Sequence, residues 1–463
     1  MPPTPRISGP LELSLEMDIQ IVNAKIVNEG KVVESDVLVR AGRIERIGSG
    51  LGSTQNLHTV DAGGKFLLPG AIDDQVHFRE PGLTHKGDIA TESRAAVAGG
   101  VTSFMEMPNT VPPVFNHDLL EQKYQLAENR SAANYSFYMG TSPDNYEEIM
   151  KTDLTKVCGL KIFMGSSTGN LLVDDPLVLE KIFGNFTGLI AVHCEHEPTV
   201  RASTEHYKRL YGETATAALH PIVRDEDACY RSSSFAVDLA SKKGTRLHVL
   251  HISTEKETHL FSNQLPLAKK KITAEACIHH LWFSDADYER LGNRIKWNPA
   301  IKKSSDREGI FKALLENRID VIATDHAPHT IEEKAKPYFD APSGGPLVQH
   351  SLNAMMEFRK RGLITIERIA EKMAHAPAVL FDVQDRGFIR EGYWADLVLV
   401  DDQQSWTVGP NNILAKCGWS PFEGYTFSSS VTHTFVSGQL VYESGKIKEG
   451  LFGKRLSFTP RNR

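Results

Sequence analysis

The sequence has few cysteines, no long apolar run and no excess of positive charge. Its five cysteines, among 463 residues, are scattered and form no Cys-x-x-Cys pair, which is typical of a reducing compartment. The longest apolar runs, such as 397–400, are strand-sized, whereas a membrane-spanning helix needs about 18 apolar residues. With 52 Lys and Arg against 58 Asp and Glu, the net charge of −6 offers no basic surface for nucleic acid. We therefore expect a cytoplasmic protein that binds neither nucleic acid nor membrane.

Two segments rich in predicted β-strands lie near the two ends of the chain. The first 16 residues lack the basic-then-apolar order of a secretory signal, and a clean strand pattern begins only at Met17. We interpret residues 1–16 as a tag or a disordered arm. Residues 17–68 have the pattern of short strands separated by glycine turns, and residues 386–455 have the same pattern. These two segments are predicted to form one small composite β-sandwich.

The segment between them, 69–385, has a different pattern of secondary structure. Strand runs of buried character alternate with helical segments, which is the pattern of βα units around a parallel sheet. Eight such runs over about 260 residues fit a (β/α)8 TIM barrel. The eight runs are 71–73, 102–105, 135–138, 160–163, 189–192, 247–250, 272–275 and 321–324.

Polar side chains follow or end several of these runs, where a barrel of this type carries its active site. They are His77, Arg79, Asn109, Lys161, His193, His251, Asp325 and His329. Imidazole and carboxylate groups are the usual ligands of zinc-like metals. Each histidine alone is weak evidence, but the set, drawn from several strands, predicts a metal site on one rim of the barrel.

Lys161 is unusual because it stands inside an apolar strand, where an unpaired ammonium would be costly. One interpretation is a side chain that reaches the surface or pairs with a carboxylate. The other is a neutral amine that has reacted with CO2, whose carbamate could bridge two cations. The sequence favours neither.

Six motifs, in this order, resemble those of the dihydroorotases within the amidohydrolase superfamily. They are Asp-Asp-Gln-Val-His-Phe-Arg-Glu-Pro-Gly at 73–82, Met-Pro-Asn-Thr at 107–110, Lys-Ile-Phe-Met-Gly-Ser-Ser at 161–167, His-Cys-Glu at 193–195, His-Ile-Ser-Thr at 251–254 and Asp-His-Ala-Pro-His at 325–329. The resemblance implies a metal-dependent TIM barrel with a composite β-sandwich, in a homodimer. The activity it implies is the reversible, zinc-dependent closure of N-carbamoyl-L-aspartate to L-dihydroorotate in pyrimidine (UMP) synthesis.

The resemblance also implies a role for each matching side chain. The metal ligands would be His77 at the more buried ion, Lys161 as a bridging N6-carboxylated lysine, His193 and His251 at the second ion, and Asp325, which would also shuttle the catalytic proton. The substrate carboxylate would be held by Arg79, Asn109 and His329, and the pyrimidine ring would contact Asn298.

One position departs from the family pattern. The first motif normally reads His-x-His, and Gln75 replaces its first histidine. An amide oxygen is a poor zinc ligand beside imidazole. Three outcomes stay open: a weakly bound first ion, a single ion on Lys161, His193 and His251, or a substitute ligand. His85 is a conceivable substitute, although its setting is more typical of a surface loop. The cofactor prediction is therefore one or two zinc ions.

Three alternatives to a dihydroorotase remain. Hydantoinases (dihydropyrimidinases) and allantoinases open similar cyclic amides, but Arg79 and Met-Pro-Asn-Thr at 107–110 favour a small-molecule substrate that bears a carboxylate. The third alternative is an inactive dihydroorotase-like chain that serves as a structural partner, for instance of aspartate carbamoyltransferase. Such a chain is expected to lose several ligands, and this one lacks only the first histidine.

Overall fold

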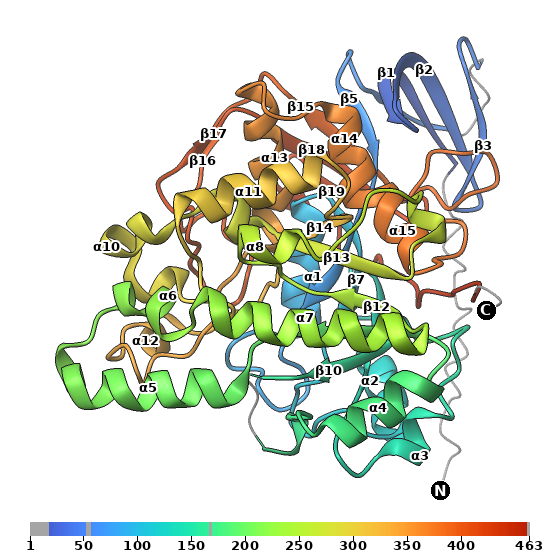
Figure 1. Cartoon of the computed structure of the whole chain (residues 1–463). Helices are drawn as coiled ribbons and strands as arrows, with labels where there is room; N and C mark the ends of the chain where they lie inside the picture. Colours follow the sequence, from blue (N-terminus) through green and yellow to red (C-terminus); the bar gives the residue numbers. More distant parts are fainter. Residues whose placement is uncertain (1–17, 52–56, 166–168, 461–463) are drawn as a thin grey trace, which may run out of the picture.

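The computed structural model describes residues 18–51, 57–165 and 169–460 (Figure 1). The predicted tag or arm, residues 1–16, lies outside the described residues. Within the described ranges, no helix is both long and apolar enough to cross a membrane. All five cysteines are described and free, and four of them are buried.

A ring of parallel strands forms the centre of the molecule. Its members are β6 (Ala71–Val76), β7 (Val101–Glu106), β8 (Asn134–Phe137), β9 (Met139–Gly140), β10 (Leu160–Phe163), β11 (Leu189–His193), β12 (Arg246–Val249), β13 (Ile272–Cys277) and β14 (Val321–Ala323). β8 and β9 are separated by one residue and occupy one position of the ring. The ring closes between β6 and β14, where the N–H of His77 donates to the carbonyl of His326 at 2.7 Å. The predicted (β/α)8 barrel is therefore confirmed, with all eight strand runs in their predicted places.

Helices surround the ring (Figure 1). They are α1 (Ile89–Ala98), α2 (His117–Ala127), α3 (Tyr146–Ile149), α4 (Pro176–Asn185), α5 (Glu197–Tyr211), α6 (His220–Val223), α7 (Glu226–Lys243), α8 (Glu255–Thr258), α9 (Ile278–Trp282), α10 (Tyr288–Leu291), α11 (Ser304–Leu315), α12 (Ile331–Lys334), α13 (Ser351–Lys360), α14 (Ile366–Ala370) and α15 (Ala376–Leu380). Several begin at an acidic cap: the Asp225 carboxylate accepts the N–H of Ala228 at the start of α7. The same helix ends at Gly244, whose φ of 71° suits a residue without a side chain.

The two ends of the chain meet in one mixed, nine-stranded sheet. Its strands are β1 (Ile19–Asn28), β2 (Lys31–Arg40), β3 (Arg43–Gly48), β4 (His58–Asp61), β5 (Phe66–Pro69), β15 (Leu397–Asp401), β18 (Ser430–Val436), β19 (Gln439–Glu443) and β20 (Lys446–Ile447). β5 pairs antiparallel with β15, Leu67 opposite Leu399, so segments 332 positions apart lie side by side. A separate pair joins β16 (Trp406–Thr407) to β17 (Thr426–Phe427). The two β-rich ends combine as predicted, and the domain limits at 68/69 and 385/386 stay predictions.

The barrel strands are buried on both faces. β7, β10 and β11 are buried along their whole length, as is usual where helices cover a parallel sheet. Their carboxyl ends all open toward the same rim, because every ring pairing is parallel. Polar residues that follow these strands in sequence are thereby brought together in space.

Candidate active site

A cavity of about 120 Å³ opens at the carboxyl ends of the barrel strands. All nine side chains that the sequence singled out line it: His77, Arg79, Asn109, Lys161, His193, His251, Asn298, Asp325 and His329. Gln75 also lines the cavity, whereas the conceivable substitute His85 does not. His85 lies 3.6 Å from Glu333 and is largely exposed, in agreement with a surface loop. The structure thus places the predicted site residues together; their individual roles stay predictions.

Two histidines face one another in this cavity. His193 ends β11, and His251 follows β12 by two residues. The Nε2–H of His193 donates to the Glu195 carboxylate at 2.8 Å, which leaves Nδ1 bare, 2.9 Å from Nε2 of His251. Burial lowers the pKa of both imidazoles, so both rings are neutral at pH 7. Ring nitrogens therefore converge on one point, which a shared cation would stabilise.

Lys161 points into the same cavity from β10. Its side chain is 1% exposed, so it does not reach the surface. Among the described residues, no carboxylate lies within salt-bridge distance of its nitrogen, which instead lies 4.5 Å from the centroid of the Phe163 ring. Burial lowers the pKa of Lys161 to about 8. These features argue against the surface and ion-paired interpretations, and the lowered pKa increases the fraction of neutral, reactive amine.

His77 and Asp325 form a second convergent pair. The Nδ1–H of His77 donates to Asn109 Oδ1 at 2.7 Å, so the bare Nε2 faces Asp325 Oδ1 at 3.2 Å. Burial also lowers the pKa of His77. The amide nitrogen of Gln75 donates to the same Asp325 oxygen at 3.3 Å. Gln75 thus contacts a predicted metal ligand, rather than adding an imidazole of its own.

These donors fit a zinc-type ion. The bare Nε2 of His77 and the bare Nδ1 of His193 each face another polar atom of the cavity, and the other nitrogen of both rings is fixed by a hydrogen bond. Such fixing of the second nitrogen is the usual arrangement around metal-bound histidines. The second nitrogen of His251, Nδ1, is buried and has no hydrogen-bond partner. The residues present are therefore compatible with the predicted metal.

A cationic group occupies one side of the cavity. Arg79, 7% exposed, donates from Nε to the carbonyl of Pro328 at 3.1 Å, and its NH2 group lies 3.0 Å from His329. Burial lowers the pKa of Arg79 to about 10, so the guanidinium remains charged at pH 7. The Lys86 ammonium lies 3.0 Å from His329 Nδ1, and the Ser343 carbonyl lies 3.0 Å from Nε2. Nε2 of His329 thus faces both a donor, the Arg79 guanidinium, and an acceptor, the Ser343 carbonyl.

The loop at 338–344, which follows the last barrel strand, borders the same side of the cavity as Arg79 and His329. Gly344 lines the cavity with a φ of 121°, and a Cβ there would lie 2.5 Å from the carbonyl of Ala327. Only glycine fits this position. Lys334 donates to the carbonyls of Pro342 at 2.9 Å and Gly344 at 2.7 Å, and so holds the loop in place.

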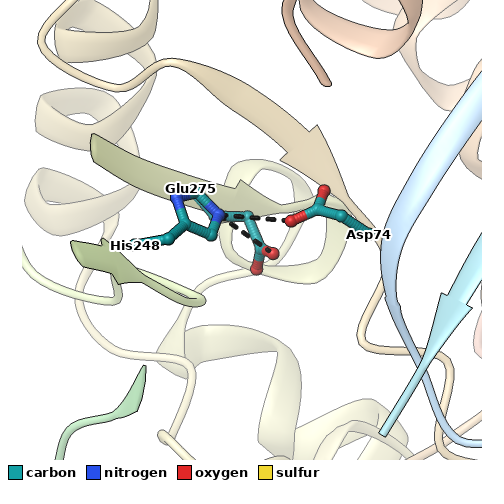
Figure 2. Close-up of side chains that lie close together, drawn as sticks. All are labelled: Asp74, His248 and Glu275. Carbon is teal, nitrogen blue, oxygen red and sulfur yellow. Dashed lines mark hydrogen bonds and ion pairs between the residues drawn. The ribbon is translucent and has the colours of Figure 1, made fainter. Parts of the chain in front are cut away.

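The sequence did not assign a role to several residues that support the site. Glu195 was quoted within a motif, yet its contact with His193 and with Arg224, at 3.0 Å, appears only in the structure. The Oε1 of Glu275 accepts the backbone N–H of His251 at 2.8 Å. Asp74, His248 and Glu275 also form a group that could hold a metal ion (Figure 2). Asp74 lies in the motif at 73–82 and His248 in the strand run 247–250, but neither residue was assigned a role of its own from the sequence.

A larger cavity lies elsewhere but has less suitable chemistry. It measures about 380 Å³ and is lined by residues that include Gln349, Trp406 and Tyr442. The amide of Gln349 is already used, because it donates to the carbonyl of Asn412 and accepts the N–H of Leu414. The smaller cavity at the barrel rim is therefore the candidate active site.

Comparison with known proteins gives a consistent result. The model of the Amidohydrolase family matches residues 66–441. A dihydroorotase of Halobacterium salinarum is 31% identical over 430 residues, covering 93% of this chain and 98% of that protein. An allantoinase of Bacillus velezensis is 30% identical, covering 94% and 96%. The solved structure of an L-hydantoinase (dihydropyrimidinase) from Arthrobacter aurescens has a TM-score of 0.90 and 27% identity, covering 95% and 100%. These matches show that the chain is a cyclic amide hydrolase and belongs to the amidohydrolase family.

Proposed function

We propose that this amidohydrolase is a dihydroorotase, which interconverts N-carbamoyl-L-aspartate and L-dihydroorotate in pyrimidine biosynthesis. The observation that carries the proposal is the charged, buried Arg79 in the wall of the cavity. Burying a cation without an anionic partner is costly. An enzyme that acts on an uncharged ring would therefore not be expected to keep such a group in its cavity. Dihydroorotate carries a carboxylate that would pair with it.

The substrate would be held from two sides. Arg79 has one edge of its guanidinium engaged by Pro328, and the remaining N–H groups can pair with a carboxylate as a fork. Asn109 and His329 lie beside it in the cavity wall. Asn298 completes the set, because its Oδ1 is buried without a hydrogen-bond partner and can accept an N–H of the substrate ring.

The amidohydrolase family is generally metal-dependent, and the donor set here suits zinc. Lys161, as a carbamate, would hold the ion together with His193, His251 and Asp325, and His77 would serve a second ion if one binds. When bound, zinc would lower the pKa of water and polarise the ring carbonyl. The Gln75 substitution leads us to propose one firmly held ion.

Asp325 would carry the proton of the reaction. In hydrolysis, the oxygen of water adds to the ring carbonyl carbon, the C–N bond breaks, and the leaving nitrogen takes up a proton. The Asp325 carboxylate lines the cavity and is held by Gln75 at 3.3 Å. It can therefore accept the proton of the attacking water and deliver it to the nitrogen without leaving its position.

Hydantoinase and allantoinase activities are the competing proposals, since proteins with those names match this chain about as well. A substrate panel separates them. The metal-loaded enzyme should hydrolyse L-dihydroorotate far faster than hydantoin, allantoin or dihydrouracil, which lack the carboxylate. Preference for an uncharged ring would refute the dihydroorotase proposal, and no turnover of any ring with added zinc or cobalt would revive the inactive-partner hypothesis. The homodimer and the cytoplasmic location belong to the same proposal.

A further inference from the structure

A second cluster of metal-type donors lies inside the barrel (Figure 2). Asp74 on β6, His248 on β12 and Glu275 on β13 have side chains that are completely buried. His248 Nε2 lies 3.2 Å from Asp74 Oδ2 and 3.9 Å from Glu275 Oε2. None of the three lines the active-site cavity. The cluster is therefore separate from the predicted catalytic donors.

The neighbours of His248 allow a tautomer that suits metal binding. The hydroxyl of Thr273 can donate to the carbonyl of Leu247 at 3.1 Å. Thr273 then accepts from His248 Nδ1, 2.9 Å away. In this tautomer Nε2 is bare, and it faces the two carboxylates. This is the arrangement of metal-bound histidines, whose second nitrogen donates to a nearby oxygen.

The carboxylates also lack the partners that buried oxygens normally have. Asp74 Oδ1 and Glu275 Oε2 are buried and accept no hydrogen bond. Only the other oxygen of Glu275 is used, by the N–H of His251 at 2.8 Å and the thiol of Cys277 at 3.0 Å. Leaving such oxygens unpaired is costly, and more so when they are charged. Burial and the neighbouring Asp74 raise the pKa of Glu275 well above its ordinary value.

A cation at the centre of the cluster gives Glu275 Oε2 a partner and offsets the negative charge of the carboxyl groups. Nitrogen and oxygen ligands bound tetrahedrally to zinc at about 2.0–2.2 Å lie about 3.3–3.5 Å apart, close to the 3.2 and 3.9 Å found here. Imidazole and carboxylate groups are both ligands of zinc-class ions. We propose that Asp74, His248 and Glu275 bind a structural zinc-class ion that joins β6, β12 and β13 beneath the active site. Because Glu275 also holds the backbone of His251, this ion would fix the position of a predicted catalytic ligand.

The proposal is tested by counting zinc in variants of the full-length protein. Replacing His193 and His251 by alanine removes two of the five predicted catalytic ligands and leaves the three side chains of the inner cluster in place. This double variant, refolded or expressed with zinc, should retain one ion per chain by elemental analysis after dialysis against a chelator. Adding Asp74→Asn should abolish that ion. The matched control Glu257→Gln, in the same background, removes a buried carboxylate that serves only Ser233, Ser253 and Thr254, and should leave the ion in place.

A double variant that holds no zinc would overturn the proposal, as would retention of the ion after Asp74→Asn. If these variants fail to fold, anomalous diffraction from wild-type crystals at the zinc edge decides the question. A peak between Asp74, His248 and Glu275 supports the inner site, and its absence from a zinc-loaded crystal refutes it. The proposed dihydroorotase activity is judged separately, by turnover of the wild-type enzyme.

Discussion

Replacing Arg79 by alanine tests the substrate assignment most directly. The guanidinium is 7% exposed, and its Nε is already engaged by Pro328, so the free N–H groups face the cavity from a fixed position. Removing one partner of a buried charge pair costs about 2–5 kcal/mol. A mid-range loss of about 3 kcal/mol corresponds to a roughly 150-fold decrease in kcat/KM for dihydroorotate. We expect most of this loss in KM, because the carboxylate is bound equally in the substrate and in the transition state.

The assay compares dihydroorotate with dihydrouracil, the same ring without the carboxylate, and measures bound zinc in parallel. Arg79→Ala should slow hydrolysis of dihydroorotate only, and zinc content should stay at the wild-type value because Arg79 is not a predicted ligand. Arg79→Lys is the matched control: it keeps the charge but loses the planar fork, and its KM should lie between the two. An unchanged KM for dihydroorotate in Arg79→Ala would refute the reasoning.

Three further predictions concern the metal. Lys161→Ala should lose zinc and activity, with partial recovery upon addition of short carboxylic acids; full activity in this variant would exclude the carbamate. Gln75→His should increase bound zinc from one ion to two per active site. The ions are counted by elemental analysis of protein that also carries Asp74→Asn, so that the proposed inner ion is not included. No gain would show that Gln75 does not limit metal number. Because burial lowers the pKa of Lys161 to about 8, the neutral amine that reacts with CO2 rises from about 9% at pH 7 to 50% at pH 8. Reactivation of metal-free enzyme by bicarbonate and zinc should therefore be roughly fivefold faster at pH 8, and an equal rate at the two pH values would contradict a neutral-amine step.

The barrel and the composition of the site could be predicted from sequence because both depend on local signals. Each strand is an apolar run of a few residues, and each predicted site residue within the barrel motifs follows or ends such a run, except Lys161, which lies inside one. Since parallel strands of a barrel bring their carboxyl ends to one rim, knowledge of the strand order was sufficient to predict that His77 and Asp325, 248 positions apart, would lie together.

The inner cluster could not be predicted in this way, because it depends on side-chain direction and strand register. Asp74 and His248 lie within their strands, and they meet only because β6 and β12 turn these two side chains toward the barrel interior at the same height. A shift of one residue in either strand would reverse the direction of every side chain in it. A sequence pattern of buried strands contains no such information, since both faces are apolar.

The net charge of −6 does not favour an anionic substrate, and the structure shows why total charge is a poor guide here. Arg79, Lys86, Lys296 and Lys334 gather around the loop at 338–344 that borders the cavity. Lys296 donates to the carbonyls of Tyr338 and Ala341, and burial lowers its pKa to about 8. Arg79, which contacts the Pro328 carbonyl and His329, and Lys296, which contacts two carbonyls, create a local positive potential that solvent screens weakly. A carboxylate entering the cavity would be stabilised by this potential, whereas a neutral ring would gain nothing from it. Substrate charge is therefore selected by a few buried groups at the rim, and the acidic surface has little influence on it.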